Sequence, residues 1–386
     1  MFAIISGKTK MKKMQTKLFN ITNFICSNLF LTVIIYIILT ILFITCKKNE
    51  DLLEENLSNL LVSPEISTID ISDITQVGAT SSAIINNDGD SFIYAIGVIW
   101  SEFENPLFPL SSNNDEGHYR ISYKNGIQES GTYIFDFGGL SPNKTYYLKA
   151  YVSFNIDNLC NIVYGNEVSF TTEALIHGSV TDIEVNNYNT VQIGNQVWMA
   201  ENLKTTKYND GTDIIYLPDE NEWSQTEQGA YVWHGNNIEN KEIYGALYNW
   251  YAVETEKLCP EGWHVPSDDD WKILEAIVDQ SFGGDTIWDK TGFRGHNAGC
   301  RLKTTEGWSS GGNGSDVFSF SAKPTGYRYP SGGYAMQSSE AGWWTSSENS
   351  NQDSWYRRIV YIYSSIERYA YTKTSGFSVR CVKNSE

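Results

Sequence analysis

Cysteine and histidine are the side chains of this sequence best suited to chemistry, and their spacing limits what that chemistry could be. The 386 residues include six cysteines and five histidines. No histidine belongs to an HExxH motif or lies at paired metal-ligand spacing. The sequence also contains no Gly-x-Ser-x-Gly nucleophile elbow and no phosphate-binding loop. These patterns predict no catalytic residue, no bound metal and no cofactor.

Cys46 lies at a position where lipidation is the expected chemistry. A basic stretch that ends at Lys17 precedes Leu29–Thr45, a run of 17 uncharged residues of which 14 are apolar, and Cys46 follows at once. This junction resembles a bacterial lipoprotein signal. The resemblance implies that residues 1–45 are a signal peptide, removed before a Cys46 that carries acyl chains such as palmitate. A run of 17 residues is also at the lower limit for crossing a membrane, so an uncleaved single-span anchor stays open.

Residues 46–61 are predicted to form a charged tether between the lipid and the folded part of the chain. Several acyl chains on one cysteine give stable attachment, whereas a single chain is marginal. The Lys-Asn-Glu-Asp start of this tether at residues 48–51 resembles surface-export tags of lipoproteins in the Bacteroidetes group. A plain solvated spacer is the alternative. Both interpretations predict an extracytoplasmic protein, attached to the outer membrane or cell surface through lipid.

The charge of the chain excludes one class of partner. The formal net charge is −18. Residues 1–46 hold five lysines and no acidic residue, so the rest of the chain carries 23 basic against 46 acidic residues, a formal charge of −23. A body this acidic cannot neutralise a run of phosphates, which argues against a nucleic-acid partner. It is also poorly suited to binding anionic lipid through charge.

Residues 62–174 alternate short β-type runs with turn residues, which is typical of an antiparallel β-sandwich. Asp88-Gly89 lies between two such runs and predicts a hairpin. The surrounding Asn-Asn-Asp-Gly-Asp lacks the further acidic ligands of a calcium loop. Residues 140–151 resemble the corner and following strand of fibronectin type III-like domains. This resemblance implies that Tyr146 or Tyr147 bonds back to the backbone, and that the domain acts as a spacer.

Residues 178–385 carry 11 of the 12 tryptophans, which predicts a loop-rich domain with a core of large aromatics. One helix is well marked. Ser267 and Asp270 predict a capping box, and the helical spacing of the next apolar residues predicts one buried face. That face consists of Trp271, Leu274, Ile277 and Val278. The three aspartates at 268–270 could be interpreted as a metal cluster. Helix capping and the favourable position of acidic residues at the positive end of the helix dipole are the simpler explanation.

Four motifs in this second part resemble the Fibrobacter succinogenes major paralogous domain family. They lie at residues 191–203, 244–252, 258–266 and 376–382. The pattern is also similar to the C-type lectin-like fold and to formylglycine-generating enzymes. These resemblances imply a mainly β chain with some α+β character: a fibronectin III/Ig-like antiparallel β-sandwich followed by a loop-rich C-type lectin-like α+β domain. They imply that the two ends of the second domain meet and that Cys259 pairs with Cys381. The even number of remaining cysteines would also allow Cys160 to pair with Cys300, but a bond between two domains is not expected.

The resemblances leave an enzyme and a binding protein to be distinguished. Formylglycine-generating enzymes need two neighbouring cysteines, but only Cys300 remains in this domain, and its surroundings at residues 298–303 read as a strand. His264 is expected to be a packed, hydrogen-bonded residue. The calcium-ligand motifs of sugar-binding lectins are absent, and Ser354-Trp355-Tyr356-Arg357 is their nearest analogue.

Binding is therefore the preferred interpretation, and a Gly- and Pro-rich loop supplies its candidate residues. These are Tyr327, Tyr329 and Tyr334, whereas Trp343 and Trp344 are assigned to the core. We expect a non-catalytic surface lipoprotein that presents a lectin-like domain to a glycan or a surface protein, on a β-sandwich stalk. The alternatives are a purely structural surface protein and an oxidoreductase-like enzyme related to formylglycine-generating enzymes.

Overall fold

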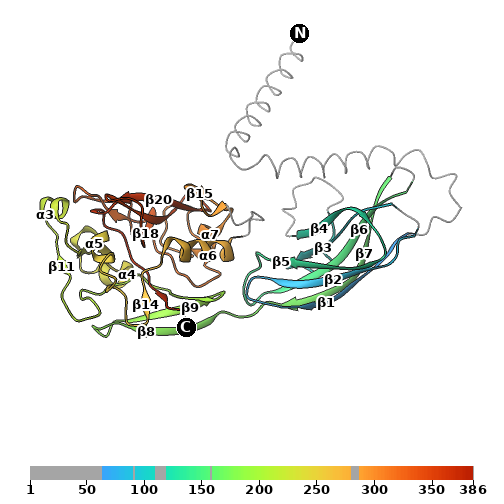
Figure 1. The fold of residues 1–386 in the computed structure, drawn as a ribbon, viewed down its shortest axis with the longest axis horizontal. Helices are drawn as coiled ribbons and strands as arrows, with labels where there is room; N and C mark the ends of the chain where they lie inside the picture. The colour runs from blue at the N-terminus through green and yellow to red at the C-terminus, as the bar shows by residue number, and fades with distance from the viewer. Residues whose placement is uncertain (1–62, 90–91, 109–118, 157–158, 280–286, 386) are drawn as a thin grey trace, which may run out of the picture.

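The computed structural model describes residues 63–89, 92–108, 119–156, 159–279 and 287–385 (Figure 1). The signal peptide predicted for residues 1–45, the lipidation site Cys46 and the tether predicted for residues 46–61 lie outside these described residues. Within the described residues, no helix combines the length and the apolar character needed to cross a membrane.

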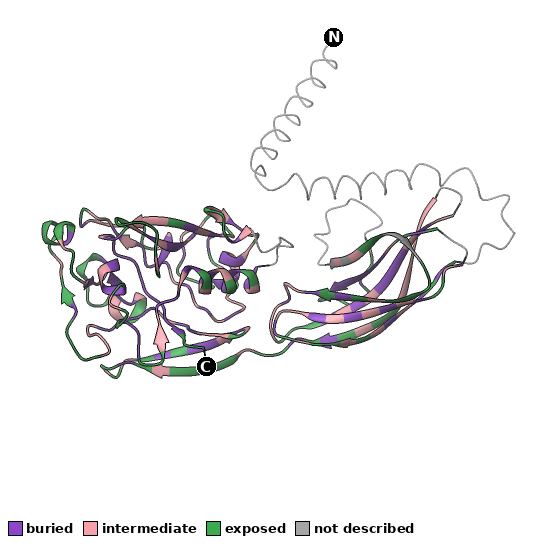
Figure 2. Cartoon of the chain, viewed as in Figure 1, coloured by how far each residue is buried: buried purple, intermediate pink, exposed green. Residues whose placement is uncertain are grey.

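In the described part of the N-terminal domain, here called the sandwich, seven antiparallel strands form two sheets. The first sheet has the order β1-β2-β5 and consists of β1 (Glu65–Ser72), β2 (Ala79–Asn87) and β5 (Gly131–Phe137). The second has the order β4-β3-β6-β7 and consists of β3 (Phe92–Ser101), β4 (Tyr119–Gln128), β6 (Thr145–Ile156) and β7 (Leu159–Thr171). Buried and exposed residues alternate along several strands (Figure 2). The inward side chains share one core, in which Trp100 contacts Phe137. The predicted antiparallel sandwich is confirmed.

Tyr146 takes the corner position that was predicted for Tyr146 or Tyr147. Its hydroxyl accepts a hydrogen bond from the backbone N–H of Ser141 at 2.9 Å, and its ring stacks on Phe170. The side chain is buried, whereas Tyr147 is half-buried. The contact ties the turn before β6 to the start of that strand.

The hairpin predicted at Asp88-Gly89 is wrong. β2 pairs with β1 and β5, whereas β3 pairs with β4 and β6, so the two strands lie in opposite sheets. The chain does turn at Gly89, where φ is 64° and the N–H donates to Asn87 Oδ1 at 2.9 Å. Turn residues can reverse the chain, but burial of the apolar faces decides which strands pair.

In the described residues of the C-terminal domain, 176–385, the strands form four sheets, which short helices connect. The terminal sheet, β14-β21-β10-β9-β8, consists of β8 (Ile176–Thr181), β9 (Asn187–Ile193), β10 (Gln196–Met199), β14 (Trp263–His264) and β21 (Val382–Lys383). The main sheet, β15-β20-β19-β18, consists of β15 (Gly292–Arg294), β18 (Glu340–Glu348), β19 (Asp353–Val360) and β20 (Ile366–Thr372). The smaller sheets are formed by β11 (Ile215–Tyr216), β12 (Ala230–Val232) and β13 (Leu247–Tyr248), and by β16 (Tyr327–Arg328) and β17 (Tyr334–Ala335). The helices are α3 (Glu220–Gln225), α4 (Asn240–Tyr244), α5 (Trp250–Val253), α6 (Asp268–Val278), α7 (Ala298–Leu302) and the 3₁₀ turn η1 (His234–Asn236).

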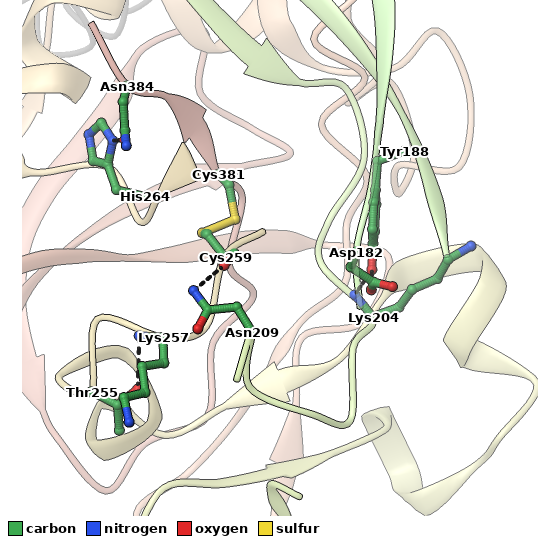
Figure 3. The surroundings of a disulfide bond; sticks show 10 residues. All are labelled: Asp182, Tyr188, Lys204, Asn209, Thr255, Lys257, Cys259, His264, Cys381 and Asn384. Carbon is green, nitrogen blue, oxygen red and sulfur yellow. Dashed lines mark hydrogen bonds between the residues drawn. A yellow bond between two sulfur atoms is a disulfide. The ribbon is translucent and has the colours of Figure 1, made fainter. Parts of the chain in front are cut away.

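The two ends of this domain meet in the terminal sheet, as the resemblance implied. Trp198 of β10 lies opposite Val382 of β21. A disulfide joins Cys259 to Cys381, with 6.0 Å between the Cα atoms, and the Asn209 side chain donates to the Cys259 carbonyl at 3.0 Å (Figure 3). No disulfide joins Cys160 to Cys300, both of which are described.

Helix α6 begins with the predicted capping box. The Ser267 hydroxyl accepts from Asp270 N–H, and the Asp270 carboxylate accepts from Ser267 N–H at 2.8 Å. Trp271, Leu274 and Val278 are fully buried, and Ile277 is half-buried against the same cluster.

A buried charge network, which the sequence did not indicate, fastens α6 to the main sheet. Glu275 is fully buried and accepts from Arg357 Nε at 2.5 Å and from Arg294. Asp268 accepts from Arg357 and from Arg368, both at 2.8 Å. Burial disfavours its charge, but these arginines still hold the pKa of Asp268 below its ordinary value. Each buried charge thus has a partner, which is what a stable buried network requires.

The main sheet separates two aromatic cores. Trp343 and Trp344 are neighbours on β18 and therefore point to opposite faces. Trp343 packs with Trp198, Trp271 and Phe320, whereas Trp344 packs on the other side against Phe377. Both tryptophans are fully buried, which confirms their assignment to the core.

Helix α7 lies at the junction of the two domains, and Figure 1 shows α6 and α7 on the side of the C-terminal domain nearest the sandwich. The strand predicted around Cys300 is wrong, since residues 298–302 are helical. An apolar run this short does not reveal its period. The buried Asp279 carboxylate accepts from Ala298 N–H at 2.9 Å and so caps the helix from another segment. Arg301 reaches into the sandwich, where it donates to the Leu140 carbonyl at 2.6 Å and to Ser141 Oγ at 3.1 Å.

Candidate functional site

The structure separates the three tyrosines that were predicted to bind a ligand. Tyr327 and Tyr329 lie together, with ring centroids 5.0 Å apart in an edge-to-face arrangement. Tyr334 belongs to a different cluster, where its ring lies 5.1 Å from the Arg328 guanidinium and 5.2 Å from the His234 ring. Tyr334 therefore helps to hold the loop in place, while Tyr327 and Tyr329 remain together at the edge of a core.

The tight turn between β16 and β17 causes this separation. Tyr329 N–H donates to the Gly333 carbonyl, and Gly332 N–H donates to the Tyr329 carbonyl. Gly332 has a φ of 98°, and a Cβ atom there would lie 2.5 Å from Glu220 Cα. Only glycine fits this position. The turn sends Tyr334 back along the second strand, away from Tyr327 and Tyr329.

Two tyrosines of β20, which sequence reasoning missed, complete the cluster. Tyr369 and Tyr371 are two positions apart on one strand, so they point to the same side of the sheet. The Tyr371 ring lies 6.4 Å from that of Tyr327, and Tyr369 is 53% exposed. The alternation of Arg-Tyr-Ala-Tyr at residues 368–371 was the available signal. We call Tyr327, Tyr329, Tyr369 and Tyr371 the aromatic face.

A rigid floor supports the aromatic face. Phe377 is buried, stacks on Tyr356 with centroids 4.7 Å apart, and contacts both Tyr327 and Tyr371. Gly342 leaves room for it, since a Cβ at that position would lie 2.6 Å from Phe377 Cδ1. The half-buried rings of Tyr327 and Tyr371 therefore rest on a close-packed neighbour, which keeps their positions defined.

A charged cluster lies beside the tyrosines on the same side of the sheet. Arg358 donates to Glu367 at 2.6 Å and forms a longer contact, 3.3 Å, with Glu340. Arg358 and Glu367 are paired across β19 and β20, one step along the sheet from the Tyr356–Tyr369 pair. The cluster has two carboxylates and one guanidinium. It therefore offers hydrogen-bond acceptors next to the rings and carries a net charge of −1.

The hydroxyls of Tyr327 and Tyr371 are neutral donors at physiological pH. Burial and a hydrogen bond to Tyr329 raise the pKa of Tyr327 above its ordinary value of 10.0, and burial raises the pKa of Tyr371 in the same direction. Both directions keep the O–H proton in place. The arrangement can stack on an apolar ligand surface and exchange hydrogen bonds at its edge.

His264 belongs to the cap of α6. Its Nε2 lies 3.2 Å from Asp270 Oδ2, and its Nδ1 lies 2.7 Å from Asn384 Oδ1. Figure 3 shows the His264 ring turned toward Asn384. Ser267 Oγ donates to the same Asp270 oxygen at 2.6 Å, so the aspartate lies between serine and histidine. In a nucleophilic triad the histidine occupies the middle position and takes the serine proton. Here the aspartate occupies the middle position, so these three residues cap the N-terminus of α6.

Metal binding and a reactive thiol are two other chemical possibilities for the described residues. No group of three or more His, Cys, Asp or Glu side chains in this part of the chain is placed to hold a metal ion. Cys300 is half-buried in α7, and no described ionisable side chain lies within hydrogen-bond distance of its sulfur.

Comparison with known proteins identifies the C-terminal domain. The model of the Fibrobacter succinogenes major domain matches residues 191–383. No curated protein matches the sequence. Among solved structures, two forms of the sensor domain of the anti-sigma factor RsgI4 from Pseudobacteroides cellulosolvens are similar to part of the chain. The shorter form is 20% identical, with 30% of this chain and 99% of that chain covered and a TM-score of 0.22. The longer form is 17% identical, with 31% and 100% covered and a TM-score of 0.21.

Scores this low carry no argument about function. The family match is of another kind, because it spans half of the chain and includes all four motifs found in the sequence, from Val191 to Val382. The chain belongs to the Fibrobacter succinogenes major domain family.

Proposed function

We propose that this protein is a non-catalytic, lipid-anchored surface protein whose C-terminal domain binds a carbohydrate through the aromatic face. One observation carries the proposal: Tyr327 and Tyr329, from the turn that β16 begins, lie beside Tyr369 and Tyr371, which share one side of the main sheet next to a charged cluster. Tyr369 reaches solvent most fully, with 53% of its surface exposed. Rings fixed in this way can bind without a large loss of side-chain entropy.

A sugar fits this surface for chemical reasons. One side of a pyranose ring presents C–H groups that pack against the negative face of an aromatic ring. Its hydroxyls need acceptors and donors at the edge, which Glu367, Glu340 and the tyrosine hydroxyls supply. The net charge of −1 favours a neutral sugar over an acidic one at this face. A flat protein surface is the competing ligand and is one outcome of the test below.

The proposed location rests on the N-terminal sequence and on the acidity of the rest of the chain. Lipid on Cys46 would attach the protein to a membrane, and its charge of −23 would keep the body soluble there. The Cys259–Cys381 disulfide fits an oxidising compartment outside the cytoplasm. A fatty-acid analogue supplied to cells should label the wild type and leave Cys46→Ala unlabelled. Equal labelling of both would exclude lipidation at this cysteine.

A glycan array combined with a surface-protein array would test the binding function. The full chain, purified in a nonionic detergent, should bind neutral glycans. For the best glycan, Tyr369→Ala and Tyr329→Ala should each weaken binding by about three- to tenfold, the loss expected for one aromatic contact. Tyr216→Ala is the matched control, because Tyr216 is 42% exposed on β11 in the same domain and lies outside the aromatic face.

The results separate the possible functions. If the chain binds a protein instead of a glycan, and Tyr369→Ala weakens that binding, the aromatic face remains the binding site but its ligand is a protein. If Tyr369→Ala and Tyr329→Ala both leave glycan binding unchanged, the aromatic face is not the glycan-binding site. Binding of neither class would favour a purely structural surface protein.

A further inference from the structure

A small recess on the C-terminal domain is positively charged, although the protein as a whole is acidic. It is lined by residues 200–202, 204, 241–245, 321 and 323 together with Arg380. Its enclosed part has a volume of about 30 Å³, enough for one or two water molecules, and it opens to solvent. It is too small for a sugar ring or a cofactor. A single functional group of a larger ligand, or a small ion, matches this size.

Arg380 lines the recess and forms no direct ion pair with any described residue. It is 1% exposed, and none of the described carboxylates lies within 4.0 Å of its guanidinium. Nη1 and Nη2 donate to neutral acceptors, among them the Phe320 carbonyl and Asn202 Oδ1, and Nε has no hydrogen-bond partner. The Phe320 and Trp343 rings lie against it. The carboxylates of Asp316 and Glu201 act on this charge from beyond ion-pair distance. A buried cation without a directly bound counter-ion is costly.

Arg380 stays charged at neutral pH in spite of this burial. Burial lowers the pKa of Arg380 to about 9, which still leaves the guanidinium protonated near pH 7. The positive charge beneath the recess is therefore permanent under physiological conditions.

Three lysines add to the positive charge of the lining. Lys204, Lys241 and Lys323 line the recess together with Arg380, against two carboxylates. Glu242 pairs with Lys204 at 2.5 Å, and Glu201 accepts two hydrogen bonds from Asn189. Lys323 has no ion-pair partner among the described residues. Four cations and two carboxylates leave a net charge of +2, in a chain whose total formal charge is −18.

We propose that this recess binds an oxyanion group, that is, a carboxylate, phosphate or sulfate, above Arg380 and beside Lys323. Such a group would neutralise the buried guanidinium and accept charge-assisted hydrogen bonds from the lysines. The inference is independent of the aromatic face, because the two sites share no residue. The anion is either free in solution or the acidic group of a larger ligand.

The test compares anions at constant ionic strength with sodium chloride as the reference. Phosphate, sulfate and acetate represent free anions, and oligogalacturonate represents an acidic sugar. Binding to the full chain is measured by isothermal titration calorimetry and by the shift in thermal midpoint. Lys323→Glu should weaken binding about tenfold, as expected for the loss of one charge-assisted hydrogen bond. Lys383→Glu is the matched control, since Lys383 is exposed on β21 and lies outside the recess.

Lys241→Gln serves as a second variant if Lys323→Glu fails to fold, and it should also weaken binding. Binding of the inorganic ions alone would assign the recess to a free anion. Stronger binding of oligogalacturonate would assign it to an acidic sugar. Sulfate and phosphate also stabilise proteins without binding to a site. The proposal is therefore wrong if Lys323→Glu and Lys383→Glu both bind the anions as strongly as the wild type does. It is also wrong if no anion binds more strongly than chloride.

Discussion

The Cys259–Cys381 disulfide should account for a large part of the stability of the C-terminal domain. The bond closes a loop of 122 residues. Closing a loop of this length in the unfolded chain removes entropy worth about 5 kcal/mol at 25 °C on the chain-entropy account. Folded proteins are stable by only about 5–15 kcal/mol in total. The double variant Cys259→Ala/Cys381→Ala should therefore lose a third or more of its free energy of unfolding.

Urea unfolding followed by tryptophan fluorescence measures this loss, because 11 of the 12 tryptophans lie in this domain. Reduction of the wild type in the unfolded state, followed by refolding, isolates the bond from the loss of two buried side chains. Cys300→Ala is the control, since Cys300 is half-buried and forms no disulfide. It should change stability by less than about 1 kcal/mol. A loss below about 1 kcal/mol in both the double variant and the reduced protein, with unchanged m-values, would refute the reasoning.

Three further predictions concern the helix cap, the buried charges and the domain junction. The hydrogen bond to Asp270 raises the pKa of His264 above its ordinary value of 6.5. The stabilisation of the folded state by protonated His264 is therefore complete below about pH 6.5, and it is lost as the pH rises through the folded-state pKa. Urea midpoints should therefore fall more with rising pH in the wild type than in His264→Asn, and parallel curves would contradict this. Glu275→Gln should cost about 3–5 kcal/mol in urea unfolding, because it leaves the buried Arg294 guanidinium without a carboxylate partner and takes one of two from Arg357. The exposed control Glu254→Gln should cost almost nothing; similar costs for both would contradict this. Arg301→Met removes the donors that hold the sandwich, so small-angle scattering should show a longer, more flexible particle, and an unchanged profile would mean that other contacts hold the junction.

The sequence predicted features whose cause is local. The capping box at Ser267 and Asp270 needs only two side chains three residues apart and the helix that they start. The corner at Tyr146 likewise depends on five residues of chain. Sandwich strands could be recognised because alternation along a strand is itself a local pattern. The family motifs led to the Cys259–Cys381 pair in the same way, through residues that can be read in order.

The candidate site could be predicted only in part. Tyr327 and Tyr329 were found because Gly and Pro place them on a loop, but the same reasoning also selected Tyr334, which a tight turn carries into another cluster. Tyr369 and Tyr371 were missed because their strand joins the others only after folding. Arg380 was recognised only as part of a motif, and the absence of a hydrogen-bond partner for its Nε is a property of its surroundings in the fold.

The amino-acid sequence by itself determined the acidity of the body, the two-part division of the chain and the family of its C-terminal half, and it predicts an export junction at Cys46. Tertiary structure decided that Asp88-Gly89 connects two sheets, that residues 298–302 form a helix, and which side chains gather on the aromatic face and in the recess. The reason is physical. Turn chemistry, capping and periodicity act over a few neighbouring residues, whereas strand pairing, burial and charge compensation depend on groups that lie far apart along the chain.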